Sequence, residues 1–491
     1  MRSKCTCILL PQPHCIYKKR KVYDMSSNGT VTVEKSNGKL PWNERLSYGA
    51  SDFACSFTFS LIGTYLMYFY TDVFGITAGA VGTLMLVARV IDALDGPFWG
   101  IMIDHTHTKW GRSRPYFLWF NAPFTIFTIL CFTTPDLPMN WKIVWAYVTY
   151  IGIDVLYSAV NIPLTSILPS MTTDPNERVL LSTIRSLFSN FGGTLISVIA
   201  LPLVTLFGGA NNPRRGFFWV AVMAAAVFFI IYLVVFANLR EHVQTRQSQQ
   251  ALPIKTSLKA LRNNWPWVIV VGLNFIYWLG MQTKGQVTIY FFKYNLDKPG
   301  LASLALFFNA VGLVSVFLTP KIVMKIGKKK TILSGLALSI LGQLVLGLGA
   351  QLLNVPLVII GTIIGNFGNG FVGALIAVLL ADSVDYGEWK NGVRAEGIVT
   401  SASSFTAKFG MGIGGAITGM LLSLGHYAPN KSQSAAALFS IEANYVWVPL
   451  VALVISFILI LFYRLTPEKE LEMTRYIDAK HARENLEDSI E

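Results

Sequence analysis

Charged residues are scarce in this 491-residue chain, in which Asp, Glu, Lys and Arg together make up 14%. They usually account for about a quarter of a soluble domain. Hydrophobic residues make up 53%, and the mean hydropathy is +0.49. Apolar stretches recur from Tyr65 to Tyr463, each long enough to cross a hydrocarbon core ~30 Å thick as a helix. The composition therefore excludes a soluble protein and predicts an all-α polytopic membrane protein.

Several motifs of other protein classes are also missing. Three of the five cysteines, Cys5, Cys7 and Cys15, lie beside His14, but their spacing matches no standard zinc site, so no metal site is predicted. The apolar patch near the N-terminus is too short for a signal peptide, and Met25 is an alternative start that leaves open whether residues 1–24 are translated. Paired catalytic groups and nucleophile motifs are not found, so we predict neither an enzyme nor a cofactor.

The net charge of +13 is concentrated in short segments between apolar runs. This is the positive-inside pattern of cytoplasmic loops, whereas a nucleic-acid-binding protein would carry one contiguous basic face. We therefore expect no nucleic-acid partner, a multi-pass protein of the cell membrane, and cytoplasmic N- and C-termini. The basic segments are 18–21, 109–114, 240–262, 321–330 and 390–394. The exceptions, which this topology places outside, are Arg214, Arg215, Lys293, Lys298 and Lys431.

Apolar runs predict about twelve membrane helices in two groups of six. A basic loop around Gly111 follows the second helix, and a similar loop around Gly327 follows the eighth, as expected for two parallel repeats of a major-facilitator fold. The predicted helices are 46–70, 77–103, 116–134, 141–168, 180–207, 216–238, 266–292, 301–325, 331–352, 355–381, 396–425 and 442–464. The predicted domains are a disordered cytoplasmic leader (1–45), a six-helix bundle (46–238), a cytoplasmic linker (239–265), a second six-helix bundle (266–465) and a cytoplasmic tail (466–491).

Four of the charged residues within predicted membrane helices are candidates for a functional role, because a charge at membrane depth costs roughly 2.5–3.5 kcal/mol on insertion scales. Arg89, Asp92 and Asp95 are spaced three residues apart and share one face of the second helix. They could form an ion pair that only joins helices, or present a carboxylate that binds a cation or proton. Lys408 in the eleventh helix lies too deep to reach the interface, and a contact with Asp92 would satisfy both charges.

Other charged residues lie nearer the cytoplasmic ends of the helices. Arg185 in the fifth helix could contact substrate, or it could pair with a carboxylate and act as a gate. A second set of charged residues is predicted to form a cytoplasmic salt-bridge gate. Its members are Arg178, Asp382, Asp385 and Arg394.

Polar and aromatic side chains within the helices could line a sugar pocket, because sugars need hydrogen-bond partners and flat apolar surfaces. Asn161 is the strongest of these signals, since a buried amide must find partners and Pro163 frees a nearby backbone carbonyl. Other candidates for this pocket are Tyr65, Tyr157, Ser158 and Lys284.

Several segments resemble the glycoside-pentoside-hexuronide:cation symporters, the branch of the major facilitators that contains the melibiose permease. The resemblance extends from Leu46 to about Leu465. Its motifs are Leu46-Ser-Tyr-Gly49 with Asp52-Phe-Ala-Cys55, Tyr65-Leu-Met-Tyr68 to Gly75, Val87-Ala-Arg89 to Asp92, Trp110-Gly111, Asn161-Ile-Pro163, Asp174-Pro-Asn-Glu-Arg178 and Ala381-Asp-Ser-Val-Asp-Tyr-Gly-Glu388.

The resemblance implies roles for individual residues. Asp92 matches a cation-site carboxylate, Lys408 matches a lysine tied to cation and sugar coupling, and Arg185 matches an arginine near the cavity. Tyr157 and Ser158 match positions beside the two sites.

The chain also departs from the melibiose permease at residues that matter for binding. Gly96 stands where that permease has its second cation-site aspartate, and Asp95 is one residue away. Its two sugar-binding aspartates correspond to Ser56 and Asn161, and two cavity tryptophans correspond to Thr165 and Gly373.

We therefore predict a monomeric transporter that imports a sugar glycoside, such as a pentoside, oligosaccharide or glucuronide, with a cation by alternating access. The lost carboxylates favour H+ over Na+ as the coupling ion, with Asp92, Asp95, Lys408 and Ser158 as coupling residues. The alternative is an uncoupled facilitator, or an exporter of another small amphiphilic solute.

Overall fold

The computed structural model describes residues 40–491 except 173, 210–211, 243–260, 395 and 488–491. Residues 40–491 belong to one compact unit. The predicted leader 1–45 and linker 239–265 therefore lie largely outside the described residues, and so does the alternative start at Met25.

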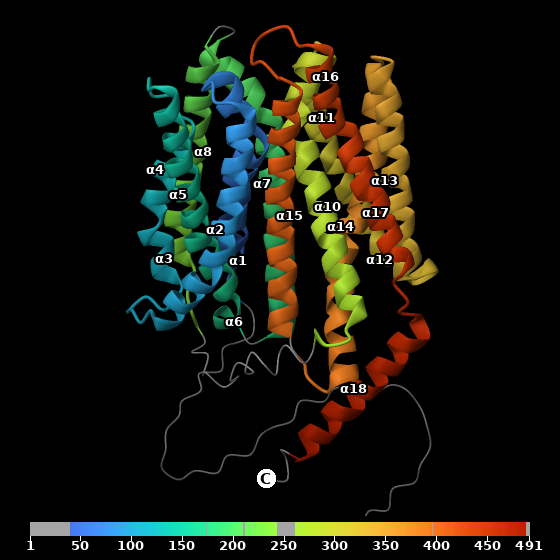
Figure 1. The fold of residues 1–491 in the computed structure, drawn as a ribbon. Coiled ribbons are helices and arrows are strands. Elements are labelled where there is room, and N and C mark those ends of the chain that lie inside the picture. Colours follow the sequence, from blue (N-terminus) through green and yellow to red (C-terminus); the bar gives the residue numbers. More distant parts are fainter. Residues whose placement is uncertain (1–39, 173, 210–211, 243–260, 395, 488–491) are drawn as a thin grey trace, which may run out of the picture. The chain divides into compact units, whose positions relative to one another are not determined.

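The described part of the first half, residues 40–242, is built of helices joined by short loops (Figure 1). Its helix α1 continues into a π-helical turn, and a short helix α6 follows α5 after one residue. The elements are α1 (Trp42–Tyr68), η1 (Phe69–Val73), α2 (Ala78–His105), α3 (Arg114–Trp119), α4 (Asn121–Cys131), α5 (Met139–Ser166), α6 (Leu168–Met171), α7 (Pro175–Gly208) and α8 (Pro213–Asn238).

The second half, residues 261–491, follows the same plan and adds a polar helix, α18, after its last membrane helix. Its elements are α10 (Trp265–Tyr290), η2 (Phe291–Asn295), α11 (Leu301–Phe307), η3 (Phe308–Ala310), α12 (Val311–Ile326), α13 (Lys328–Gln351), α14 (Val355–Asn391), α15 (Glu396–Leu424), α16 (Ala435–Glu442), η4 (Ala443–Trp447), α17 (Val448–Leu461) and α18 (Pro467–Glu487). We call the end of the membrane helices from which α18 extends the α18 end (Figure 1).

Nine segments of the described chain are long and apolar enough to cross a membrane. The other three predicted spans are also helical, but their sequences are less uniformly apolar. Helix α2 contains the charged residues Arg89, Asp92 and Asp95, and α10 contains Lys284 among several amides. The predicted span 116–134 is divided at Phe120 into α3 and α4. The all-α, major-facilitator-type prediction is confirmed.

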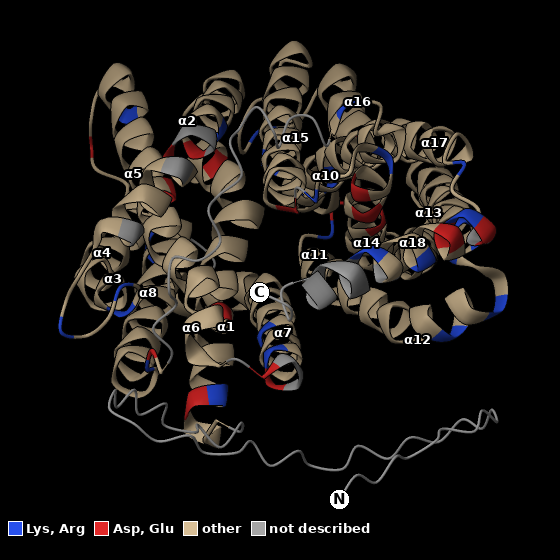
Figure 2. Ribbon diagram, turned by 90° about the horizontal axis from the view of Figure 1, so that it is seen from below, with Lys and Arg blue, Asp and Glu red and all other residues tan. Residues whose placement is uncertain are grey.

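The predicted helix bounds are accurate where a loop follows the apolar run. They are less accurate where the helix extends beyond its apolar run into a charged segment. The prediction 355–381 ends ten residues before the end of α14 at Asn391, because it followed apolar runs only. The extra turns contain Asp382, Asp385 and Glu388, which are held by ion pairs. Viewed from the α18 end, these acidic turns of α14 lie close to α18 (Figure 2).

Glycines allow close packing between α13 and α14. A Cβ added to Gly342 would lie 2.3 Å from the backbone nitrogen of Gly365, and one added to Gly361 would lie 2.4 Å from that of Leu346. In membranes, small residues at such contacts let helix backbones approach closely. This contact fixes two helices of the second half against each other.

We predict that Gly342→Ala lowers the thermal stability of the detergent-solubilised protein, because the new methyl group overlaps backbone atoms and overpacking costs about 1–3 kcal/mol. Gly285→Ala is the matched control, since nothing lies within 4 Å of a Cβ at Gly285 and alanine favours helix. The melting temperature should fall only for Gly342→Ala. Equal melting temperatures for the two variants would contradict the packing described here.

Candidate functional site

A buried charge cluster joins three membrane helices from both halves of the chain. It consists of Arg89, Asp92 and Asp95 on α2, Asp154 on α5 and Lys408 on α15. The three-residue spacing on α2 directs its members to one side of the helix. The three carboxylates are 3%, 8% and 5% exposed for Asp92, Asp95 and Asp154.

Asp92 is the centre of this buried charge cluster. Its Oδ1 accepts hydrogen bonds from Lys408 Nζ at 2.7 Å and from Ser158 Oγ at 3.2 Å. Its Oδ2 accepts one from Arg89 Nη1 at 3.0 Å. The structure thus brings together Asp92 and Lys408, the pair expected to join the halves, and it also contains the ion pair with Arg89. Both carboxylate oxygens of Asp92 therefore accept hydrogen bonds.

Arg89 has a second carboxylate partner on another helix. Its Nη1 lies 3.4 Å from Asp154 Oδ1, and its Nη2 donates to Tyr150 Oη at 3.0 Å. Asp154 and Tyr150 were not among the predicted site residues. Asp154 could have been found by the rule that identified Asp92, because it is a carboxylate inside a predicted membrane helix.

Asp95 differs from the other members of the cluster because both of its buried carboxylate oxygens lack a hydrogen-bond partner among the described residues. An ionised carboxylate without partners is expensive in apolar surroundings. With all groups ionised, three carboxylates and two basic side chains leave the cluster with a net charge of −1. One added proton or monovalent cation would make it neutral.

A polar group lies between α1, α5 and α7. Ser56 Oγ and Ser189 Oγ are 2.5 Å apart, and Asn161 Nδ2 donates to Tyr157 Oη at 3.4 Å. The Tyr157 ring stacks on Phe59 with centroids 5.0 Å apart. Hydroxyl and amide groups beside aromatic rings are suited to a neutral sugar, with hydrogen bonds to its hydroxyls and ring contacts to its apolar face.

The other predicted substrate residues are not gathered in this group. Tyr65 is fully buried and donates to the Ser197 carbonyl oxygen, a position within the core that does not support contact with substrate. Lys284 donates to Gln343 Oε1 at 2.9 Å beside a small cavity formed by second-half helices only. Thr165 and Gly373 are exposed on α5 and α14.

Arg185 pairs with a carboxylate, which is one of the two alternatives predicted for it; the other was contact with substrate. Its Nη2 lies 3.3 Å from Asp52 Oδ1 on α1, and the guanidinium lies 6.0 Å from the centre of the Tyr48 ring. These contacts hold α7 to α1 within the first half. Asp52 belongs to a motif read in the sequence, but was not predicted as a site residue.

Charged residues at the α18 end pair within the second half. Asp382 binds Lys328 at 2.7 Å, and Lys328 also binds Glu470 of α18 at 3.2 Å. Arg394 binds Asp385 at 2.8 Å and Glu388 at 3.0 Å. Burial lowers the pKa of the Arg394 guanidinium, but its bonds to Glu388 and Asp385 outweigh that effect and raise the pKa above its ordinary value.

Arg178, the remaining predicted gate residue, lies in the first half. It donates to the carbonyl oxygens of Thr172 and Pro169, and it forms no ion pair with a carboxylate in the described part of the chain. The predicted gate residues therefore do not connect the halves in this conformation, and their role in gating stays a prediction.

At the opposite end, the two halves are tied together around Asp72, the last acidic residue of the first span. Asp72 Oδ1 accepts from Lys293 Nζ at 3.0 Å and from Tyr294 Oη at 2.5 Å, while its Oδ2 accepts from Tyr427 Oη at 2.7 Å. Asn430 Nδ2 donates to the Asp72 carbonyl oxygen at 2.7 Å. We call these five residues the Asp72 cluster. It closes the space between η1 and the second half at this end.

The Asp72 cluster was not predicted, although the sequence held a signal for it. Lys293 was one of the basic residues that did not fit the positive-inside pattern. Its ammonium group also donates to Tyr68 Oη at 3.0 Å and to Asn430 Oδ1 at 2.8 Å. Because its charge is paired within the protein, Lys293 need not follow the positive-inside pattern of free loop charges.

Comparison with known proteins identifies relatives along nearly the whole chain. A family model described as MFS/sugar transport protein matches residues 47–467. An isoprimeverose transporter of Lactiplantibacillus pentosus is 61% identical over 447 residues, which cover 91% of this chain and 93% of that protein. A glucuronide carrier protein homolog of Escherichia coli (strain K12) is 33% identical over 446 residues, covering 90% and 96% of the two chains.

Solved structures share the fold at low sequence identity. A bacterial homolog of the human lysosomal transporter Spinster aligns with a TM-score of 0.65 and 15% identity, covering 89% of this chain and 99% of that chain. The nucleoside transporter NupG aligns with a TM-score of 0.63 and 14% identity, covering 86% and 100%.

We predict that Asp72→Asn opens the end closed by the Asp72 cluster, because it removes the charge that holds Lys293 and two tyrosine hydroxyls. Spin labels at Asp136 and Lys431, two exposed loop positions in different halves, would report this. The distance distribution should gain a longer component.

Lys298→Gln is the control for Asp72→Asn, since Lys298 is exposed at the same end and forms no described ion pair. Its distance distribution should match the wild type. An unchanged distribution for Asp72→Asn would show that the Asp72 cluster does not hold the halves together.

Proposed function

Because this chain belongs to the MFS/sugar transport protein family, as a cation-coupled importer of sugar glycosides, we propose that its substrate is a pentoside of the isoprimeverose type and that its coupling ion is a proton. The isoprimeverose transporter that is 61% identical over nearly the full chain supports this substrate class.

The polar group in the first half agrees with a neutral glycoside. Ser56 and Asn161 replace carboxylates with a hydroxyl and an amide, and Tyr157 adds an aromatic face beside Phe59. These groups exchange neutral hydrogen bonds with sugar hydroxyls, so they discriminate by shape and hydroxyl position more than by charge.

The observation that carries proton coupling is the unpartnered carboxylate of Asp95. Asp92 already has three donors, from Lys408, Arg89 and Ser158, whereas both Asp95 oxygens lack partners among the described residues. A single carboxylate can bind one proton, while a metal cation needs several oxygen ligands at once. Asp95 is therefore the proposed proton carrier.

Lys408 links that proton to movement between the halves. It lies on α15 of the second half and binds Asp92 on α2 of the first, so the ion pair must lengthen whenever these helices separate. A proton on Asp95 reduces the negative charge that Lys408 must balance, and so changes the free energy of that separation. Proton and sugar then favour the same transition, as reciprocal linkage requires.

We further propose that the α18 end is cytoplasmic, since the basic loops cluster there. With the Asp72 cluster closed at the opposite end, the described conformation is then the inward-facing one. Transport by alternating access would require that cluster to open while ion pairs form at the cytoplasmic end.

The test is uptake of labelled isoprimeverose into proteoliposomes under an inward proton gradient. Accumulation that collapses with a protonophore would support proton symport. Equilibration that ignores both proton and sodium gradients would instead support an uncoupled facilitator, while accumulation driven only by sodium would overturn the choice of ion.

We predict that Asp95→Asn abolishes proton-driven accumulation but leaves exchange of labelled for unlabelled sugar, because exchange needs no net proton movement. Asp136→Asn, the same substitution at an exposed loop position, is the control and should accumulate sugar normally. Full accumulation by Asp95→Asn would remove Asp95 from the mechanism.

For thermal stability, we predict that the substitution at Asp92 does more damage than the substitution at Asp95. Asp92→Asn removes the carboxylate that Lys408 and Arg89 share. Arg89 keeps Asp154, and the Lys408 side chain is 39% exposed, so the loss should be smaller than the cost of about 3–5 kcal/mol for breaking a fully buried pair. The melting temperature in detergent should therefore fall for Asp92→Asn and stay level or rise for Asp95→Asn, which loses no described hydrogen bond. A larger fall for Asp95→Asn would contradict the described contacts.

A further inference from the structure

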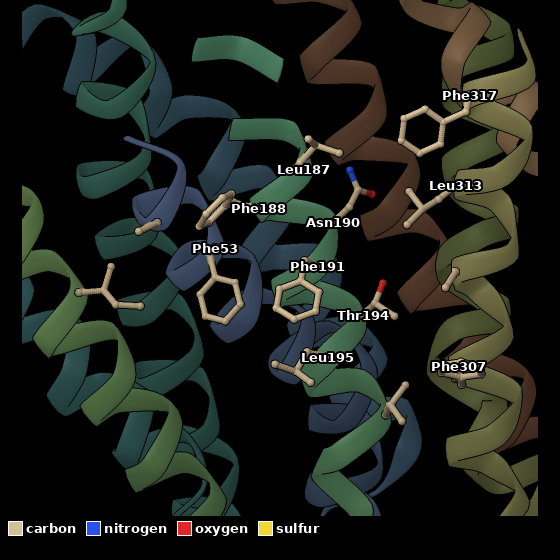
Figure 3. Close-up of a pocket in the computed structure, with 14 residues that line it drawn as sticks. Phe53, Leu187, Phe188, Asn190, Phe191, Thr194, Leu195, Phe307, Leu313 and Phe317 are labelled. Carbon is tan, nitrogen blue, oxygen red and sulfur yellow. The ribbon is translucent and has the colours of Figure 1, made fainter. Parts of the chain in front are cut away.

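A cavity of about 870 Å³ lies between α7 of the first half and helices α11 and α12 of the second. In Figure 3, Leu187, Phe191 and Leu195 of α7 lie across from Phe307, Leu313 and Phe317. Phe191 is 62% exposed and Phe317 is 70% exposed. Both side chains belong to membrane-spanning segments, and exposed apolar side chains there suit contact with lipid chains.

The groove formed by this cavity gains a few polar side chains toward the α18 end, while its walls there stay mainly apolar. A second cavity of about 500 Å³ shares Leu187, Asn190, Leu313 and Phe317 with the first. Its additional lining includes Ser182, Ser186 and the guanidinium-bearing Arg178. The two cavities therefore form one continuous groove, to which α7 adds hydroxyl groups and one guanidinium toward the α18 end.

Two basic residues, Arg178 and Lys321, lie toward the α18 end of the groove. Arg178 stands near the start of α7 without an ion-pair partner among the described residues. On α12, Lys321 follows Phe317 by four residues, so it lies one turn further along the same helix face. Lys321 is exposed and also lacks an ion pair in the described part of the chain. Arg178 thus lines the second cavity, and Lys321 lies one turn beyond the lining residue Phe317 without lining either cavity itself.

We propose that this groove binds an anionic phospholipid, with an acyl chain against Phe191 and Phe317 and the phosphate between Arg178 and Lys321. Each end of such a lipid finds suitable side chains here. Basic residues between membrane helices suit an anionic headgroup, and the aromatic walls suit its acyl chain. The site differs from the polar group around Ser56 and Asn161 and from the buried charge cluster. Neither of them contributes a lining residue to the groove.

The location gives the lipid a consequence for transport. The groove separates the two halves, so its walls must approach each other if the α18 end closes. A lipid held there would stabilise the conformation described here and slow that closure. This consequence rests on the proposed alternating-access function, whereas the binding site itself does not.

The test is native mass spectrometry of the delipidated full-length protein titrated with dioleoyl phosphatidylglycerol or dioleoyl phosphatidylcholine. Wild type should retain the anionic lipid in preference. Arg178→Gln and Lys321→Gln should each reduce that preference about fivefold, from roughly 1 kcal/mol for each basic residue near a lipid headgroup. Phe317→Ala should weaken retention of both lipids, because it shortens the apolar wall.

Lys390→Gln serves as the control. Lys390 is an exposed basic residue on α14, a helix that contributes no lining residue to either cavity, whereas Lys321 shares a face of α12 with the lining residue Phe317. It should retain the wild-type preference. Equal retention of the two lipids by the wild type would overturn the anionic site, and so would equal effects of Lys321→Gln and Lys390→Gln. Sugar accumulation, measured after the same variants are reconstituted into proteoliposomes, separates this outcome from failure of the proposed transport function.

Discussion

Asp92 is shared by two cations that belong to different halves of the chain, and much of the structure depends on that sharing. Lys408 reaches it from α15 at 2.7 Å and Arg89 from its own helix at 3.0 Å, so neither cation is left unpaired at membrane depth. The arrangement also places charge where the halves must move past each other. A purely structural ion pair would be better placed within one half, as the Arg45–Glu177 pair is at 2.6 Å.

The two ends of the molecule differ in the kind of contact they make. Around Asp72, one carboxylate collects an ammonium and two phenol hydroxyls from the second half, so that end is held by directional bonds between the halves. At the α18 end, the acidic turns of α14 bind Lys328, Arg394 and Lys480 of their own half. Between α7 and α12 there is instead an open groove. In alternating access, each conformation is closed at one end and open at the other. The contacts here fit that requirement, because they join the halves at one end and stay within one half at the other.

Much of the site could be anticipated from single residues. Asp92, Asp95 and Lys408 were evident because charges inside apolar helices are rare and need partners. Asp154 meets the same criterion, but its helix also contains tyrosines and Asn161, whose chemistry suits sugar binding. Tyr65 is a contrasting case: a tyrosine in a membrane helix has the right chemistry for a sugar site, but its hydroxyl donates to the Ser197 carbonyl oxygen inside the core, and its role in sugar binding stays a prediction.

The sequence by itself determined the membrane class, the approximate bounds of the helices and which charges lie at membrane depth, because these follow from local composition and helix periodicity. Only the tertiary structure decided which partners those charges have. The Lys408–Asp92 contact spans 316 residues and the Tyr427–Asp72 contact spans 355, and no local pattern fixes a pairing over such separations. Which carboxylate is left without a partner is decided by the same packing, since Asp92 and Asp95 differ by less than one helical turn and only one of them faces Lys408.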